Sequence, residues 1–179
     1  MATDISKHSI PGSSALAALQ RAGVDTVVTV PDWIQLALHE RLNKQSEGGI
    51  RVIPCSNENQ VVTVAAGLTI GGKRPLVMMQ NQGLYNCFNT LRAVCLDAHI
   101  PMVFMVGQFG REFENIGKPS VESSRNMVRL AEPFLHTLGV TYHVLDSEAD
   151  LPRIEQAFAQ AQEQRNAVVL LVSAPMAWR

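Results

Sequence analysis

Three short polar segments of the sequence carry the residue types best suited to binding a ligand, and each follows an apolar run. They are Val30–Trp33, which contains Asp32; Cys55–Glu58; and Gln80–Gly83, a run of three carboxamides closed by glycine. Carboxylates accept hydrogen bonds and exchange protons, while carboxamides both donate and accept. An acid in the first turn of a helix, such as Glu58, also complements the helix dipole, and a polar turn can simply cap a helix. Taken one at a time, these segments therefore allow a structural and a chemical interpretation.

Alternating strand and helix signals place the three segments in an α/β fold. Short apolar or β-branched runs predict strands at Thr26–Val30, Ile50–Pro54, Leu76–Met79, Met102–Val106, Val140–Leu145 and Val168–Val172. Apolar residues at helical spacing predict helices at Ser13–Ala22, Trp33–Lys44, Glu58–Gly71, Leu84–Ala98, Arg125–Leu138 and Glu148–Arg165. This alternation predicts one domain over residues 1–179, a three-layer αβα fold with a six-stranded, mostly parallel sheet. Ligands of such sheets bind at the carboxyl ends of the strands, which is where the polar segments lie.

A glycine-rich stretch at the end of the helix predicted at Glu58–Gly71 looks at first like a phosphate-binding loop. Gly67 to Lys73 satisfies the pattern G-x-x-x-x-G-K, but Arg74 stands where the motif needs Ser or Thr. The order is also reversed, because these glycines end a helix and lead into a strand. The stretch is therefore interpreted as a helix C-cap and turn. No G-x-G-x-x-G occurs in the sequence, so nucleotide binding is not expected.

Composition limits the classes of partner. The 179 residues include 15 Lys+Arg and 16 Asp+Glu, a formal net charge of -1, which argues against a nucleic-acid binder. Charged residues make up only 17% of the chain against 46% hydrophobic residues, so part of the surface is expected to lie against other subunits. The one long irregular stretch, residues 107–124, is expected to be a functional or mobile loop.

The cysteines and the apolar runs indicate the compartment. Cys55, Cys87 and Cys95 are odd in number and show no metal-ligand spacing, so reduced thiols and a cytoplasmic location are expected. The N-terminal residues show no secretory signal, and no apolar run approaches the length needed to span a bilayer. No membrane partner is expected.

Taken together, the polar segments and their flanking residues resemble a known domain. The pattern Glu58-x-x-Val61-x-x-x-Ala65-Ala66-Gly67, then Lys73-Arg74-Pro75, then Gln80-Asn81-Gln82-Gly83-Leu84-Tyr85-Asn86-x-x-Asn89-x-Leu91 is similar to the pyrimidine-binding domain of thiamine-diphosphate enzymes. Within these enzymes it is most similar to the α subunit of the sulfopyruvate and phosphonopyruvate decarboxylase group, whose pattern Val30-Pro31-Asp32 and Ile100-Pro101 also fit. The resemblance spans roughly Gly23 to Arg111 and implies the thiamine-diphosphate-binding fold.

The resemblance implies a role for each polar segment. The glutamate matching Glu58 would be the catalytic residue, hydrogen-bonding N1′ of the aminopyrimidine and so favouring the tautomer that activates the thiazolium carbon for decarboxylation of a 2-oxo acid. Gln80, Asn81, Gln82 and Gly83 would line the cofactor pocket. Asn86 matches an asparagine that caps this turn, which gives it a structural role first. His39 and His99 are interpreted as core or surface residues.

The substrate end departs from the family pattern. Asp32, Trp33 and Arg111 are the candidates for substrate contacts, but the family usually has a small residue at Gln82, glycine at Tyr85, and an arginine-glycine pair where this chain has Gly110-Arg111. A sulfonate or phosphonate substrate therefore does not carry over, and aryl or alkyl 2-oxo acids stay open.

Half of the expected cofactor site is missing from the sequence. Thiamine-diphosphate enzymes hold the diphosphate through Mg²⁺ with a Gly-Asp-Gly run and a downstream Asn, and no Gly-Asp-Gly occurs here. The resemblance therefore implies that a second chain binds the Mg²⁺ and the diphosphate, in an α2β2 or larger assembly, while this chain contributes no metal ligand.

Three other functions remain as alternatives. One is a thiamine-diphosphate carboligase or lyase subunit that acts on another substrate. Another is a non-catalytic regulatory α/β module, although such a module would have little reason to keep Glu58. A flavodoxin-like protein would need a Ser/Thr/Gly-rich phosphate loop after the first strand, and Val30–Trp33 is not one.

Overall fold

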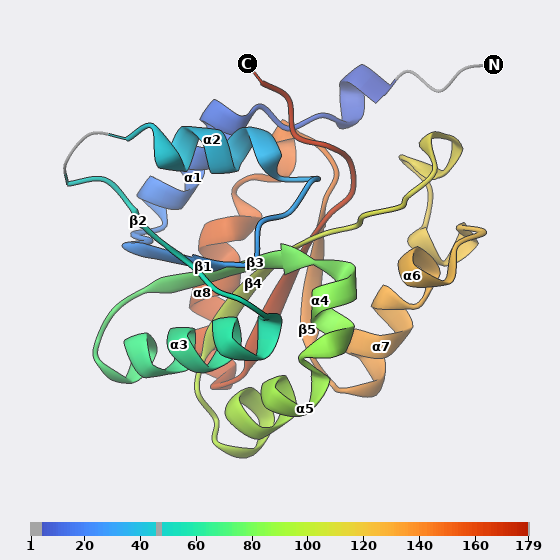
Figure 1. The fold of residues 1–179 in the computed structure, drawn as a ribbon. Coiled ribbons are helices and arrows are strands. Elements are labelled where there is room, and N and C mark those ends of the chain that lie inside the picture. Colours follow the sequence, from blue (N-terminus) through green and yellow to red (C-terminus); the bar gives the residue numbers. More distant parts are fainter. Residues whose placement is uncertain (1–4, 46–47, 179) are drawn as a thin grey trace.

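A six-stranded sheet, parallel throughout, forms the middle layer of the structure (Figure 1). The computed structural model describes residues 5–45 and 48–178. Its strands are β1 (Thr26–Thr29), β2 (Arg51–Pro54), β3 (Pro75–Gln80), β4 (Met102–Gly107), β5 (Thr141–Leu145) and β6 (Ala167–Val172). Their order in the sheet is β2-β1-β3-β4-β6-β5. The predicted three-layer αβα fold and all six predicted strands are confirmed, with the sheet wholly rather than mostly parallel.

Helices cover both faces of this sheet. The α-helices are α1 (Gly12–Arg21), α2 (Leu36–Asn43), α3 (Glu58–Ile70), α4 (Asn81–Asn86), α5 (Phe88–Leu91), α6 (Asn126–Arg129), α7 (Ala131–Thr137) and α8 (Arg153–Gln164). Shorter turns of 3₁₀-helix are η1 (Ile5–His8), η3 (Phe113–Asn115), η4 (Ser120–Glu122) and η5 (Glu148–Asp150), and η2 (Arg92–Asp97) is a π-helix. In Figure 1, α1 and α2 lie on one side of the sheet, while α3 and α5 lie on the other.

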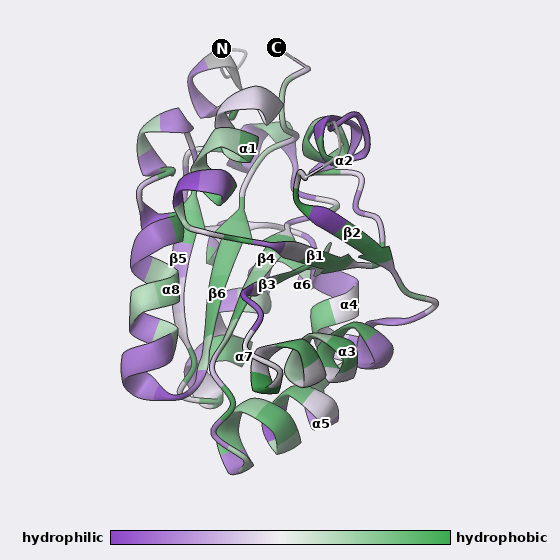
Figure 2. Ribbon diagram, turned by 90° about the vertical axis from the view of Figure 1, so that its left-hand side faces the viewer, coloured by the Kyte–Doolittle hydropathy of each residue, from purple (hydrophilic) through white to green (hydrophobic). Residues whose placement is uncertain are grey.

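Alternate residues of each strand supply two separate hydrophobic cores. Val27, Met105 and Leu170 point toward α1, α2 and α8, whereas their neighbours Val28 and Phe104 point toward α3, α5 and α7. The strands are buried on both faces because helices cover both, which explains why they appear in the sequence as continuous apolar runs. Figure 2 shows the difference between the two layers: α8 is hydrophilic over much of its outer surface, whereas α3 is mostly hydrophobic.

Three helices differ from their predicted extents. The predicted helix at residues 84–98 begins earlier, at Asn81, and is broken at Cys87 before it continues as the π-helix η2. The predicted helix at residues 125–138 is divided at Leu130, and the one at residues 148–165 is interrupted before Arg153. Pro133 and Pro152 explain the last two breaks, because proline has no N–H to donate to the preceding turn.

The glycine-rich stretch that mimics a phosphate loop has the predicted structural role. The helix α3 ends at Ile70, Gly71 is its C-cap, and Gly72 takes a φ of +79° before the chain enters β3. The amide of Lys73 donates to the carbonyl of Leu68 at 2.9 Å, which closes the turn. Among the described residues, no helix is long and apolar enough to cross a membrane.

Candidate active site

Glu58 opens α3 immediately after β2, at the carboxyl edge of the sheet. Two side chains define this helix start: Asn57 Oδ1 accepts from the amide of Gln60 at 3.0 Å, and Gln60 Oε1 accepts from the amide of Ser56 at 2.9 Å. These bonds satisfy amides that a helix start leaves unpaired. They therefore fix the first residue of the helix, and with it the direction in which the half-buried Glu58 side chain leaves the backbone.

The Glu58 side chain lies directly against α4, where Gly83 makes room for it. A Cβ atom at Gly83 would lie 2.4 Å from Cγ and 2.8 Å from Oε1 of Glu58, closer than any real contact. On the next turn of the chain, Asn86 Nδ2 donates to Glu58 Oε2 at 2.9 Å. Within the part of the chain that the structure describes, Oε1 has no hydrogen-bond partner. Glu58 is thus held by one oxygen and offers the other.

The carboxamides of residues 80–82 have three different positions. Gln80 is half-buried at the end of β3 and precedes α4, while Gln82 is exposed. Asn81 is fully buried, and its Nδ2 donates to the carbonyls of Phe109 at 3.1 Å and Met127 at 2.8 Å. Both hydrogens of the Asn81 amide are therefore used to join α4 to the segments that follow β4.

Asp32, a candidate for substrate contact, is buried beneath this edge of the sheet. Its carboxylate accepts from the amide of Ile34 at 2.8 Å and from Nε2 of Gln35 at 2.6 Å, and it is only 1% exposed. A Cβ at Gly107 would lie 2.0 Å from Asp32 Oδ2, so the acid reaches the end of β4 through a position that only glycine permits. Burial raises the pKa of Asp32 to about 6, although the bonds from Gln35 and Ile34 oppose this shift.

His39 completes the buried polar group around Asp32. Its Nε2 accepts from the amide of Asp32 at 3.3 Å, so that nitrogen carries no proton. Burial lowers the pKa of His39 to about 4, in keeping with a neutral ring. The interpretation of His39 as a core residue is confirmed, and His99 is exposed as expected.

The three candidate substrate residues do not share one opening. Asp32 is closed off, and Trp33 beside it is 70% exposed. Arg111 belongs to the loop after β4, where it donates to the side chains of Asn115 and Gln108 and to the carbonyls of Asn115 and Lys118. It lines a cleft at the end of β5 that neither Asp32 nor Trp33 reaches.

The aromatic and sulfur-containing residues around the site are mainly core. Met78 and Met79 are fully buried, and Tyr85 packs edge-on against Phe134 with ring centroids 5.3 Å apart. The Tyr85 hydroxyl donates at 3.0 Å to the carbonyl of Met127, which Asn81 also bonds. Cys55 is partly buried.

The sequence does not reveal the contacts of two residues of the site. Asn86 matches a capping residue by resemblance, but the structure shows its amide on Glu58. Gln35 is fully buried, and its Nε2 bonds both Asp32 and the carbonyl of Met105 at 3.2 Å. The helical spacing of residues 33–44 gives Gln35 no distinction, because its partners are distant in the chain.

This geometry fits one end of a planar, hydrogen-bonding heterocycle. A carboxylate with one free oxygen, set against a glycine that leaves space, is suited to accept a hydrogen bond from a ring nitrogen. No group of three or more His, Cys, Asp or Glu residues that could hold a metal ion occurs among the described residues.

Comparisons with known proteins identify the family of the chain. Residues 12–128 match the family described as thiamine pyrophosphate enzyme, N-terminal TPP binding domain. A sulfopyruvate decarboxylase subunit alpha from Methanothermobacter thermautotrophicus is 31% identical over 121 residues, covering 66% of this chain and 72% of that protein. A sulfopyruvate decarboxylase from Methanosarcina acetivorans is 24% identical over 169 residues; the match covers 94% of this chain but only 41% of that relative.

Solved structures share the fold. The thiamine diphosphate-dependent 4-hydroxybenzoylformate decarboxylase of Rhodococcus jostii RHA1 superposes with a TM-score of 0.69 at 21% identity, over 94% of this chain and 32% of that one. At that identity the likeness establishes the architecture alone. The family match covers well over half of the chain and includes Glu58 and the segment 80–86. The chain therefore belongs to the thiamine pyrophosphate enzymes, as a member of their N-terminal TPP-binding domain family.

Proposed function

We propose that this chain is the pyrimidine-side subunit of a heteromeric, thiamine-diphosphate-dependent 2-oxo acid decarboxylase. The observation that carries the proposal is the placement of Glu58 against Gly83, with Asn86 on one carboxylate oxygen and the other oxygen free. The relatives named as sulfopyruvate decarboxylases support the class of reaction. The substrate itself is left as a 2-oxo acid, because the candidate substrate residues Asp32, Trp33 and Arg111 do not line a common pocket.

In this proposal Glu58 controls a proton. Its free Oε1 would share a proton with N1′ of the aminopyrimidine, and the bond from Asn86 would keep the carboxylate from turning away. Gln80 and Gly83 would border the ring, while Asn81 fixes the turn that carries them. When bound, thiamine diphosphate supplies the electron sink for the departing carboxylate.

A second chain is part of the proposal. The absence of Gly-Asp-Gly from the sequence leaves no group here to hold Mg²⁺ and the diphosphate. The relative from Methanothermobacter is named as a subunit alpha, which supports an unlike partner. The mostly hydrophobic α3, which begins at Glu58, also has exposed residues such as Ile70 at 73% that a partner would cover (Figure 2). An α2β2 assembly is the smallest that pairs the sites.

The test begins with co-expression of the chain and a partner that carries Gly-Asp-Gly and a downstream Asn. The purified complex, with Mg²⁺ and thiamine diphosphate, is assayed for CO₂ release from a panel of alkyl, aryl and sulfonated 2-oxo acids. Glu58→Gln should lower kcat by about 10²–10⁴-fold, because that is the usual contribution of a positioned proton-transfer group. Cofactor should still bind to the variant complex.

Glu163→Gln is the matched control, since it removes an exposed carboxylate from α8, on the other face of the sheet. It should leave the rate unchanged. Normal turnover by Glu58→Gln would refute the proposed mechanism, and turnover by the chain without a partner would refute the division between two subunits.

A further inference from the structure

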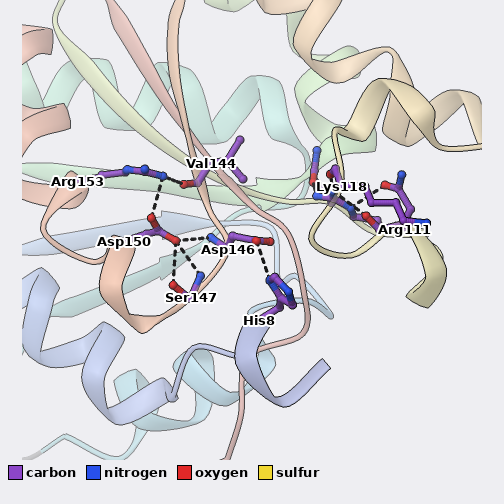
Figure 3. A network of polar contacts seen from close by, with 10 residues as sticks. His8, Arg111, Lys118, Val144, Asp146, Ser147, Asp150 and Arg153 are labelled. Atoms are coloured by element: carbon purple, nitrogen blue, oxygen red, sulfur yellow. Dashed lines mark hydrogen bonds and ion pairs between the residues drawn. The ribbon is translucent and has the colours of Figure 1, made fainter. Parts of the chain in front are cut away.

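A cleft of about 570 Å³ lies at the far end of the carboxyl edge, away from Glu58. It is bounded by η1, by the loop after β4, and by the turn between β5 and η5; its lining residues include Lys7, His8, Arg111, Lys118 and Asp146. Figure 3 shows this region, with His8 and Asp146 joined and with Arg111 and Lys118 on the neighbouring loop. A volume of this size suits a small metabolite rather than a single ion.

The walls of the cleft are connected to one another. His8 Nδ1 lies 2.7 Å from Asp146 Oδ2, which ties η1 to the end of β5. The His8 ring also packs on the loop, because a Cβ at Gly117 would lie only 2.7 Å from ring atoms Cε1 and Nε2. Gly117 has a φ of +80°, so both its conformation and its contact require glycine. The cleft is thus formed by packed contacts and not by a gap beside a loose segment.

The acidic side chains in the cleft are already engaged. Asp146 pairs with His8, and Asp150 pairs with Arg153 at 2.9 Å. Glu132 accepts from the hydroxyl of Ser120 and from that of Tyr142, the latter at 3.0 Å. Each of these carboxylates therefore has a partner within the protein, although the partners of Glu132 are neutral hydroxyls.

The basic side chains show the opposite pattern. Among the described residues, Lys7, Arg111 and Lys118 form no ion pair with a carboxylate. Arg111 is bonded only to neutral oxygens, one of which is the carbonyl of Lys118, so the two cations are held on the same short loop. Together with Arg153, four Lys and Arg side chains line the cleft against three carboxylates, those of Glu132, Asp146 and Asp150. The excess of positive charge lies with the two lysines, which have no acidic partner in the described part of the chain, so an anion between them is favoured.

We propose that this cleft binds a small organic anion, a metabolite bearing a carboxylate or phosphate group, which Lys7 and Lys118 contact directly. Arg111 holds the loop through its hydrogen bonds to Asn115 and Lys118, and it adds its positive charge to the cleft. The site is independent of the proposed function, because neither Glu58 nor the segment 80–86 lines it. Bound anion would join η1 to the loop after β4 more firmly, since the two lysines come from these two walls.

The test measures binding directly and needs no turnover. The purified full chain, in complex with its partner if one co-purifies, is dialysed to equilibrium against labelled inorganic phosphate and, separately, labelled succinate at low salt. At least one anion should bind saturably, with one site per chain. Binding of phosphate alone or of succinate alone would support the site and identify the preferred group.

Matched lysine variants locate the site. The double variant Lys7→Gln, Lys118→Gln should weaken binding by at least about tenfold, because it removes two charge-assisted hydrogen bonds from exposed positions. Lys73→Gln removes an exposed lysine at the opposite edge of the sheet and should bind as the original chain does. Unsaturable uptake of both anions, equal binding by the double variant, or equal loss in Lys73→Gln would each overturn the proposal.

Discussion

At the scale of single residues, the site depends on a missing side chain. Gly83 has no Cβ, and the Glu58 side chain occupies the space in which one would lie. The close approach involves Cγ and Cδ of Glu58 and not only its terminal oxygens, so a small rotation of the acid would not relieve it. The position of the carboxylate is therefore encoded twice, by the cap that starts α3 and by the glycine in α4.

Gly83→Ala should displace Glu58 and lose activity together with stability. An added methyl in a filled space costs about 1–3 kcal/mol, and Asn86 would lose its partner. Urea unfolding of the chain and the decarboxylation assay of the complex measure the two effects. Gly67→Ala is the control in the isolated chain: nothing lies within 4 Å of the Cβ it adds, and it replaces a helical glycine, so it should stabilise by up to about 1 kcal/mol. An unchanged rate for Gly83→Ala would show that the position of Glu58 does not matter.

The pair Asp32 and His39 should give opposing pH dependences that offset one another. The pKa of Asp32 is raised to about 6 from 3.8, so between these values its carboxyl is protonated in the folded protein and ionised in the unfolded chain. The contribution of Asp32 to the free energy of unfolding therefore falls as the pH rises from 4 to 6. The lowered pKa of His39, about 4 against 6.5, does the reverse, so its contribution grows as the pH rises over a similar window. Each shift corresponds to roughly 3 kcal/mol.

Single variants should separate the two contributions. Relative to the original chain, the free energy of unfolding of His39→Gln should fall as the pH rises from 4 to 6. That of Asp32→Asn should rise over the same interval. Urea unfolding at four values from pH 4 to 7 provides the comparison. Curves that run parallel to that of the original chain would mean that neither group is protonated as described.

At the scale of elements, α4 connects the Glu58 side of the sheet to the segments after β4. Asn81 bonds the carbonyls of Phe109 and Met127, and Tyr85 bonds the same Met127 carbonyl. These contacts join residues 28 to 46 positions apart in the chain, so no local pattern reveals them. The helix α4 and the segments that contain Phe109 and Met127 are therefore one mechanical unit.

Asn81→Ala should loosen this unit. It leaves the carbonyl of Phe109 without this donor, at a cost of about 1–3 kcal/mol, while the carbonyl of Met127 keeps its bond from the Tyr85 hydroxyl. Hydrogen exchange should accelerate in residues 107–130 more than in the core strands. Gln82→Ala, at the exposed neighbouring position, should change stability by no more than about 0.5 kcal/mol. Equal protection of the loop in both variants would contradict the role given to Asn81.

How far the sequence predicts these elements depends on the range of the forces involved. The strands are evident because burial on both faces demands continuous apolar runs, and Glu58 is evident because it begins a capped helix. The break at Cys87 has no proline or glycine to announce it and follows from tertiary packing. Gln35 and Asn86 acquire their roles only when distant segments meet.

At the scale of the whole molecule, the proposed function assigns one half of a cofactor site to this chain. The two-chain proposal accounts for three features of the chain. These are the low share of charged residues, the mostly hydrophobic α3, and the lack of a clustered set of metal ligands among the described residues. The described part of the chain places Glu58 at the edge of the sheet, where the proposed partner would bring the metal and the diphosphate.

Magnesium should therefore act only through the assembly. Millimolar Mg²⁺, with or without thiamine diphosphate, should leave the Tm of the isolated chain unchanged, since no metal-binding group occurs in its described part. The same additions should raise the Tm of the two-chain complex, because ligands that bind only the folded state stabilise it, and EDTA should reverse the gain. A cofactor-dependent rise in the isolated chain would contradict the proposal.

The strand order also has a consequence for biosynthesis. The inner strand β4 pairs with β6, and Met102 faces Ala167, so β4 must wait for a segment made 65 residues later. At ribosomal speed this delay is on the order of several seconds, during which one edge of a fully apolar strand is unpaired. The nascent polypeptide is then at its most prone to aggregate. Co-expression of chaperones that shield strand edges should therefore improve its yield.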